Sequence, residues 1–187
     1  MSNNEKQKWI LCDNCRKIFS IFVNQIFPHE SIYCPYCNFL ASILETSRQT
    51  IYHFTDPRNL SSIRKYGLLS WQILIRQKIE HYPASNNLSR ELDAHHGLQN
   101  YVRLCLKRSH PMAGLAFHEH RISGIVWLEV NIIVTSWRST LFSSDNAAST
   151  RAHIDSNRST AFDSNSLQAE VLVEGSVKPK WLIFPPQ

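Results

Sequence analysis

The chain has 187 residues, of which 43% are hydrophobic and 11% aromatic, so it can bury a core and is not a disordered polypeptide. Twenty Lys and Arg against fifteen Asp and Glu give a formal net charge of +5, which suits a nucleic-acid partner without requiring one. No apolar run approaches the roughly 20 residues that span a bilayer, and the first residues, MSNNEKQKW, lack a signal-peptide pattern. These features argue against a membrane-spanning helix and predict a cytoplasmic protein.

Four of the five cysteines form two Cys-x-x-Cys pairs, Cys12 with Cys15 and Cys34 with Cys37. Each pair can supply two thiolates to a tetrahedral Zn²⁺ site, whereas two disulfides are disfavoured in a chain without a secretion signal. We therefore predict a structural zinc ribbon over residues 1–45, followed by a second domain over residues 46–187. The sequence leaves open whether the ribbon contacts nucleic acid.

The second domain begins with a predicted strand over residues 50–54. A helix follows, with Asp56 as its N-terminal cap, Pro57 in its first turn and Gly67 at its end. Residues 71–80 are compatible with a second helix, and residues 81–100 are polar.

The remaining elements alternate between strands and helices, which predicts an α+β fold. The sequence YVRLCL favours a strand that buries Cys105, and Pro111 starts a helix. GIVWLEVNIIV, residues 124–134, is the longest β-rich run and predicts a buried pair of strands. The Ser-, Asn- and Asp-rich residues 138–166 predict a long loop, and LQAEVLVEG and KPKWLIF predict the closing strands.

Two polar features stand out against this background. His53 and Thr55 alternate in a strand and therefore share one of its faces, where they form either a pocket wall or a satisfied polar pair. Glu170 begins the predicted strand EVLVE, which places a carboxylate at the rim of the sheet. An ordinary strand-end glutamate remains the simpler interpretation, and Glu174 is the competing candidate on the same face.

Four blocks together resemble the DarT family of NAD-dependent ADP-ribosyltransferase toxins that act on nucleic-acid bases. The blocks are YHFTDPRNLSSIRKYGLLS, NYVRL leading to RSHPM, LFSSDNAAS, and LQAEVLVEGSVKPKWLI, and they follow the family's order from residue 51 to about residue 183. The resemblance implies an α+β ADP-ribosyltransferase-like fold, with split mixed sheets around a cleft for NAD. It also implies a toxin whose partner is a macrodomain-type antitoxin or another neutralising protein.

The resemblance assigns roles residue by residue. Glu170 matches the catalytic glutamate, and Arg90 is the best match for the essential arginine, with Arg103 and Arg108 as rivals. The residues that it implies for NAD binding are His53, Phe54, Thr55, Ser62, Leu69, Ser70 and Arg90. Those expected to contact the nucleic acid are Asp145, Asn146, Arg108, Arg151 and His153.

The chemistry is consistent with these roles. Breaking the bond between nicotinamide and ribose develops an oxocarbenium-like cation, which an ionised Glu170 stabilises selectively. The same carboxylate can take the proton of the attacking base nitrogen, whereas Arg90 stays charged and acts electrostatically.

Three matters stay open in the sequence. The Cys-x-x-Cys pairs are not part of the DarT core, so the acceptor is uncertain, with single-stranded DNA favoured and RNA possible. An NAD-dependent RNA 2′-phosphotransferase is an alternative enzyme of the same fold group. A non-catalytic zinc-ribbon protein that binds nucleic acid is the alternative from another class.

Overall fold

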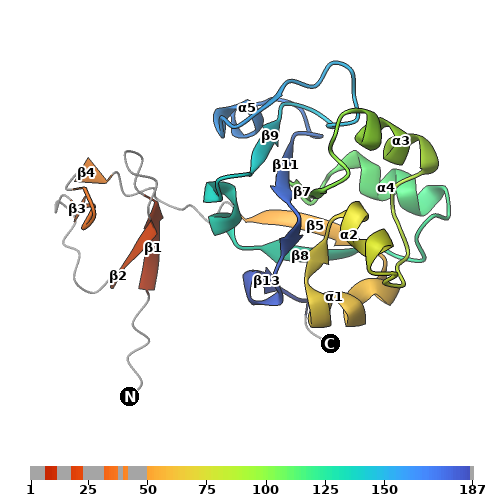
Figure 1. Cartoon of the computed structure of the whole chain (residues 1–187), viewed down its shortest axis with the longest axis horizontal. Coiled ribbons are helices and arrows are strands. Elements are labelled where there is room, and N and C mark those ends of the chain that lie inside the picture. Colours follow the sequence, from red (N-terminus) through yellow and green to blue (C-terminus); the bar gives the residue numbers. More distant parts are fainter. Residues whose placement is uncertain (1–6, 12–17, 23–31, 38–39, 42–49, 186–187) are drawn as a thin grey trace. The chain divides into compact units, whose positions relative to one another are not determined.

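The computed structural model describes residues 7–11, 18–22, 32–37, 40–41 and 50–185, which divide between two units, Met1–Gln49 and Thr50–Gln187 (Figure 1). The first unit contains two antiparallel hairpins. They are β1 (Gln7–Leu11) with β2 (Ile18–Phe22), and β3 (Ile32–Tyr33) with β4 (Leu40–Ala41).

The predicted zinc ligands fall partly in this unit's described residues. Cys34 and Cys37 lie at the turn after β3, and Cys34 is buried. Cys12 and Cys15 lie outside the described residues, so the four-cysteine site remains a prediction from the sequence.

The second unit is built on a seven-stranded sheet in the order β10-β9-β11-β7-β5-β8-β13, in which every neighbouring pair is antiparallel. The strands are β5 (Ile51–Thr55), β7 (Tyr101–Cys105), β8 (Val126–Val130), β9 (Leu141–Ser143), β10 (Ile154–Asp155), β11 (Glu170–Glu174) and β13 (Leu182–Ile183). A separate two-stranded sheet pairs β6 (Leu68–Leu69) with β12 (Ser176–Val177). The expected mixed pairing is therefore wrong for the described residues, although the expected α+β class is confirmed.

The large sheet is nearly divided between β5 and β7. These strands pair at one position, Tyr52 opposite Cys105, whereas β5 pairs with β8 along its whole length. Beyond Tyr52, the backbone N–H and C=O groups of β5 and β7 that face the division have no partner on the opposite strand. Other polar groups must therefore form hydrogen bonds with them. The division is where the pocket described below opens.

The α-helices are α1 (Leu60–Tyr66), α2 (Trp71–Arg76), α3 (Asn87–His95), α4 (Pro111–His118) and α5 (Ser159–Phe162). In Figure 1, α1 to α4 lie together on one side of the view of this unit, and α5 lies beside β9. Among the described residues, short 3₁₀ helices add to them: η2 (Pro57–Asn59), η3 (Ile132–Ser136) and η4 (Pro179–Trp181). No helix in the described part of the chain has the length and apolar character needed to cross a membrane.

The predicted ends of the first helical segment are confirmed. The Asp56 carboxylate accepts a hydrogen bond from the Arg58 backbone N–H at 2.8 Å and caps η2, which continues into α1. Gly67 ends α1 with a φ of 86°, a value that favours glycine. Pro111 starts α4 as predicted, and Cys105 is buried.

Three predictions of secondary structure are wrong. Residues 131–136 do not form a second strand after β8, because the Asn131 side chain accepts from the Ile133 N–H and starts η3. That turn still buries Val134, so the apolar residues serve the core without being in a strand. Residues 138–166 are not one loop, since they contain β9, β10 and α5, and α2 ends at Arg76 rather than at residue 80.

Asp56 is a fully buried carboxylate that joins the start of η2 to the turn before β8. Besides Arg58, it accepts hydrogen bonds from the Ser123 N–H at 2.6 Å and from the Ser123 hydroxyl. The Arg58 guanidinium, followed by the backbone and hydroxyl donors, holds the pKa of Asp56 well below its ordinary value, although burial alone would raise it. The ionised form therefore stabilises the fold.

We predict that Asp56→Asn lowers the free energy of unfolding by about 2 kcal/mol at pH 7, because an amide cannot accept all these donors. A carboxylate whose folded pKa is depressed contributes stability above its unfolded pKa of about 3.9 and loses it as pH falls. Urea unfolding should therefore show the difference between wild type and Asp56→Asn narrowing below about pH 4. Asp163→Asn, at an exposed position, is the control; a difference for Asp56→Asn that stays constant with pH would contradict the role of ionisation.

Candidate active site

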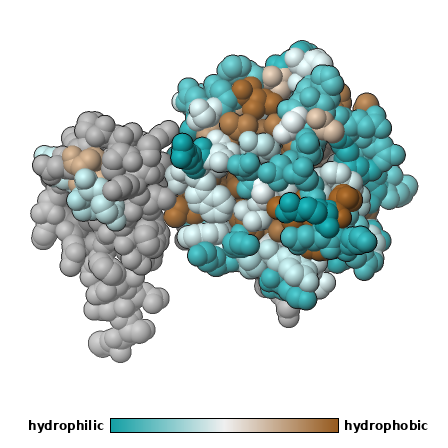
Figure 2. All heavy atoms as spheres, in the orientation of Figure 1, coloured by the Kyte–Doolittle hydropathy of each residue, from teal (hydrophilic) through white to brown (hydrophobic). Residues whose placement is uncertain are grey.

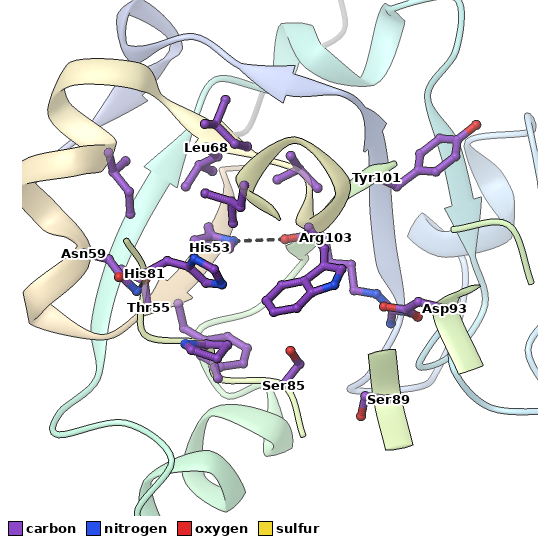
Figure 3. Close-up of a pocket in the computed structure, with 18 of the residues that line it drawn as sticks. His53, Thr55, Asn59, Leu68, His81, Ser85, Ser89, Asp93, Tyr101 and Arg103 are labelled. Atoms are coloured by element: carbon purple, nitrogen blue, oxygen red, sulfur yellow. Dashed lines mark hydrogen bonds and ion pairs between the residues drawn. The ribbon is translucent and has the colours of Figure 1, made fainter. Parts of the chain in front are cut away.

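A pocket opens where β5 and β7 separate (Figure 3). Its walls come from β5, η2, α1, β6, α2, the segment 79–85, α3 and β7, and further from the start of α4, the turn at residues 146–148 and the first residue of β11. We call residues 79–85 the rim segment. The walls combine apolar side chains such as Leu68, Leu69 and Tyr66 with a few polar ones, as is usual for a site that binds a small organic molecule.

His53 bridges the division in the sheet. Its Nδ1 lies 3.0 Å from the carbonyl oxygen of Arg103 on β7, and because a carbonyl can only accept, Nδ1 carries the hydrogen. Burial lowers the pKa of His53, while the bond to Arg103 partly offsets this effect. The imidazole is therefore neutral near pH 7, and its Nε2 remains a hydrogen-bond acceptor on a residue that lines the pocket.

Thr55 and the rim segment are held by one side chain, that of Asn59. The Asn59 Nδ2 donates to the Thr55 hydroxyl at 3.0 Å and to the Tyr82 carbonyl at 2.9 Å, and its Oδ1 accepts from the Tyr82 N–H at 2.9 Å. Arg90 holds the other end of the rim segment, since its Nη1 donates to the Ser85 carbonyl at 3.0 Å. The rim is thus fixed from η2 and from α3.

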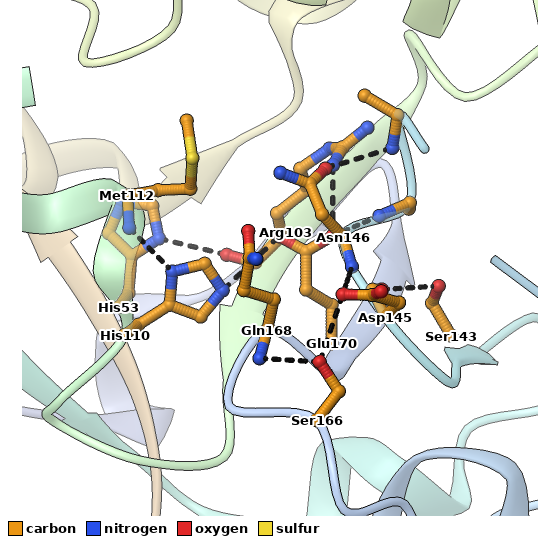
Figure 4. Close-up of polar contacts among 12 residues, drawn as sticks. His53, Arg103, His110, Met112, Ser143, Asp145, Asn146, Ser166, Gln168 and Glu170 are labelled. Carbon is orange, nitrogen blue, oxygen red and sulfur yellow. Dashed lines mark hydrogen bonds and ion pairs between the residues drawn. The ribbon is translucent and has the colours of Figure 1, made fainter. Parts of the chain in front are cut away.

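Glu170, at the first position of β11, is the buried carboxylate of the pocket, with 5% of its surface exposed. Its Oε2 accepts from Arg103 Nη1 at 2.9 Å and from the Ala147 N–H at 2.8 Å (Figure 4). Its Oε1 has His110 Nε2 at 4.0 Å, beyond hydrogen-bond distance. The two oxygens therefore differ, one held by two donors and one available to another group.

Arg103 joins Glu170 to two other parts of the structure. Its Nη2 pairs with the Asp93 carboxylate on α3, and its Nη1 also lies 3.3 Å from Asn146 Oδ1. Burial alone would lower the pKa of Arg103, but Glu170 and Asp93 reverse the effect and raise it. The guanidinium is a permanent positive charge between two carboxylates.

The polar turn over residues 143–149 aims a backbone donor at Glu170. Asp145 accepts from the Asn146 N–H at 2.8 Å and from the Ser166 hydroxyl at 2.9 Å, and Asn146 Oδ1 accepts from the Ala148 N–H at 2.9 Å. These bonds fix the turn so that the intervening Ala147 N–H meets the carboxylate.

The structure brings together about half of the residues predicted from the sequence. Those that line the pocket are His53, Phe54, Thr55, Ser62, Leu69, Asn146 and Glu170. Ser70 instead caps α2 and donates to Asn100, and Asp145 supports the turn behind Glu170. Arg90 lies at the outer wall, where its guanidinium stacks on Trp71 at 4.6 Å.

Three predicted nucleic-acid contacts lie outside the pocket lining. Arg108 forms an ion pair with Glu129, His153 lies 3.1 Å from Asp155, and Arg151 is exposed. Glu174, the rival carboxylate, is exposed at the other end of β11. The arginine that meets Glu170 is Arg103, one of the two rivals named for the essential arginine, and not Arg90.

Sequence reasoning missed Asn59, Asp93 and His110. Asp93 comes from α3, a helix that was not predicted because its segment is polar, although Asn86 supplies an N-terminal cap by accepting from the Ser89 N–H. His110 caps α4 through its Nδ1, which accepts from the Met112 N–H at 3.3 Å. Within the described ranges no group of three or more His, Cys, Asp or Glu can hold a metal ion.

Comparisons with known proteins indicate the family and the fold. The family described as "ssDNA thymidine ADP-ribosyltransferase, DarT" matches residues 52–183. The structure of Thermosipho africanus DarTG in complex with ADP-ribose is similar, with a TM-score of 0.59 and 20% identity over 72% of this chain and 42% of that chain. So is Thermus sp. 2.9 DarT in complex with ADP-ribosylated ssDNA, with a TM-score of 0.58 and 16% identity over 74% of this chain and 82% of that one. The present chain thus spans less than half of the Thermosipho chain, and no curated protein sequence matches it.

Proposed function

The chain belongs to the DarT family of ssDNA thymidine ADP-ribosyltransferases, and from this premise we propose that it transfers ADP-ribose from NAD to a base of single-stranded DNA, with release of nicotinamide. The observation that carries the proposal is the buried Glu170 at the pocket, with one oxygen fixed by Arg103 and Ala147 and the other available. A carboxylate in this state suits the stabilisation of a developing sugar cation.

We assign the pocket beside His53 to the nicotinamide–ribose part of NAD. The neutral His53 Nε2 is an acceptor suited to a ribose hydroxyl, and the apolar side chains of Leu68 and Leu69 suit the face of the nicotinamide ring. Phe54, Thr55 and Ser62 complete the proposed seat.

In the proposed reaction, the bond between ribose C1′ and the nicotinamide nitrogen breaks, and the electron pair leaves with nicotinamide. The base nitrogen forms the new bond to C1′, and its proton passes to the free Oε1 of Glu170. The fixed Oε2 keeps the carboxylate oriented during the transfer, which avoids reorganisation at the moment of reaction.

We propose that Arg103 orients the Glu170 carboxyl group, and that Asp93 orients Arg103 from the opposite side. The resemblance implies Arg90 as the essential arginine. Its hydrogen bond to Ser85 and its stacking on Trp71 instead favour a role in holding the rim segment in place. Asn146, on the pocket and beside Arg103, is the residue best supported for the acceptor side.

Three further proposals rest on the sequence or on the family alone. A structural Zn²⁺ held by Cys12, Cys15, Cys34 and Cys37 would tie together an N-terminal segment that is short for a hydrophobic core. A macrodomain-type antitoxin is the proposed partner, and the cytoplasm, where NAD is available, the proposed location.

To test the reaction, the full chain and its Glu170→Gln variant are incubated with NAD and short thymidine-containing DNA, and the products are weighed by mass spectrometry. We expect wild type to add one ADP-ribose per modified base, and Glu170→Gln to lose about 100- to 1,000-fold in kcat, because the amide cannot stabilise the cation. Glu174→Gln, at the other end of the same strand, is the matched control and should retain activity. Transfer of the phosphate of 2′-phosphorylated RNA to the ADP-ribose part of NAD, with release of nicotinamide and no change to DNA, would favour the alternative enzyme.

The same assay separates the two arginines. If Arg103 holds the carboxylate, Arg103→Gln should lower kcat about 100-fold, whereas Arg90→Gln should mainly raise the KM for NAD through a loosened rim. The reverse pattern would return the essential role to Arg90. Circular dichroism of each variant checks that the fold is intact.

For the zinc site, we predict one Zn²⁺ per chain in the purified protein, measured by elemental mass spectrometry, and its loss in the Cys12→Ser/Cys15→Ser variant. Cys105→Ala is the control, since Cys105 lies in the sheet core. Unchanged metal content in the double variant would rule out the ribbon.

A further inference from the structure

Basic side chains from two segments far apart in the sequence gather beside the pocket. Arg64 and Lys65 lie in the last turn of α1, and Lys178 and Lys180 lie at the start and within η4; all four are exposed. On the face seen in Figure 2, hydrophilic residues lie over α1 near the C-terminal end of the chain. We call these four residues the α1–η4 basic surface.

The two segments are in direct contact. A β-carbon at Gly67, the residue that ends α1, would lie 2.1 Å from the Val177 carbonyl oxygen and 3.1 Å from the Lys178 Cα. The pairing of Leu68 with Val177 between β6 and β12 fixes the same approach. The four charges are therefore held together by the fold.

This positive charge is not compensated within the described part of the chain. Neither α1 nor η4 contains an acidic residue, and no ion pair forms there at any of the four positions, whereas Arg58, Arg108 and Arg121 all have carboxylate partners. The Glu174 carboxylate, close in sequence to Lys178, faces the Asn100 amide at 3.4 Å. Uncompensated cations on a fixed surface create a potential that attracts phosphates.

Aromatic rings lie next to three of the cations. The Arg64 Cζ lies 4.2 Å from the centre of the Phe184 ring, Lys65 Nζ 4.8 Å from that of Tyr66, and Lys180 Nζ 5.0 Å from that of Trp181. Such contacts restrict the mobility of the cationic side chains. Tyr66 is 39% exposed and also lines the pocket, so the surface continues from the pocket wall.

We propose that the α1–η4 basic surface binds the phosphates of the single-stranded DNA that flank the reacting base. The inference rests on the proposed function and adds a path for the acceptor strand. Lys178 and Lys180 are not among the residues that line the pocket, so their charges are available for a chain that extends beyond it. Contacts of this kind position a strand without reading its sequence, and an exposed Tyr66 offers a face on which a base can stack.

The test compares two double variants of the full chain that each remove two positive charges. Lys178→Gln/Lys180→Gln removes half of the proposed surface. Arg138→Gln/Arg151→Gln removes two exposed charges from the 138–166 segment, the alternative path for the strand. Binding of a fluorescent oligothymidine is measured by anisotropy over a range of salt concentrations, and the transfer assay gives KM and kcat separately.

For Lys178→Gln/Lys180→Gln we expect binding about tenfold weaker at low salt, and a salt dependence reduced by about 1.4 in the slope of log K against log salt, since each phosphate contact on a single strand contributes about 0.7. The KM for DNA should rise by a similar factor, while kcat and the KM for NAD stay within about twofold of wild type. The arginine variant should keep the wild-type slope.

Equal DNA binding by wild type and Lys178→Gln/Lys180→Gln would overturn the inference and leave the surface to an acidic protein partner. A loss confined to Arg138→Gln/Arg151→Gln would overturn it as well and move the strand to the other segment. If wild type binds DNA through Lys178 and Lys180 but transfers nothing from NAD, the proposed function fails, and the surface is a DNA-binding surface without a reacting base. If wild type does not bind the oligonucleotide, the inference fails.

Discussion

The structure depends on the position of Arg103 at the division of the sheet. Its carbonyl has no strand partner across the gap and is satisfied by the His53 side chain, which keeps the two parts of the sheet together where the ladder stops. Its guanidinium binds Glu170 on β11 and Asp93 on α3. One residue therefore links four elements of the pocket, and removing it would leave the buried Glu170 and the half-buried Asp93 without their shared counter-charge.

This arrangement makes the two sides of the pocket chemically different. On the β5 side, the polar groups are neutral. Burial keeps His53 uncharged, and the Thr55 hydroxyl accepts a hydrogen bond from Asn59. On the β11 side, charged side chains are concentrated in the Asp93–Arg103–Glu170 group, where one guanidinium lies between two carboxyl groups. A cation that develops between the two sides meets a carboxylate already fixed by Arg103 and the Ala147 N–H, and it meets no competing positive charge from the histidine.

The sequence predicts the local backbone conformation correctly where a single side chain determines it. Asp56 and Gly67 fix the ends of the first helical segment, and the apolar run after Glu170 places that residue at the start of β11. The sequence did not reveal η3, because Ile and Val satisfy the core equally well from a strand and from a turn that Asn131 initiates. The choice between Arg90 and Arg103 could not be made either, since it depends on which arginine faces β11 across strands 67 residues apart in the chain. Asp93 was missed for the same reason, because the ion pair between this helix residue and Arg103 depends on how the helix packs against the folded sheet.

The side chain of Asn59 has a consequence for how the pocket exchanges its contents. The Asn59 amide forms hydrogen bonds with both the N–H and the carbonyl of Tyr82. It thus makes the backbone hydrogen bonds that a neighbouring strand would otherwise make to the rim segment. Because the same amide also holds Thr55, movement of the rim breaks these bonds together rather than one at a time. The rim segment should therefore behave as a cooperative gate with two states, open and closed, rather than as a loop that frays gradually.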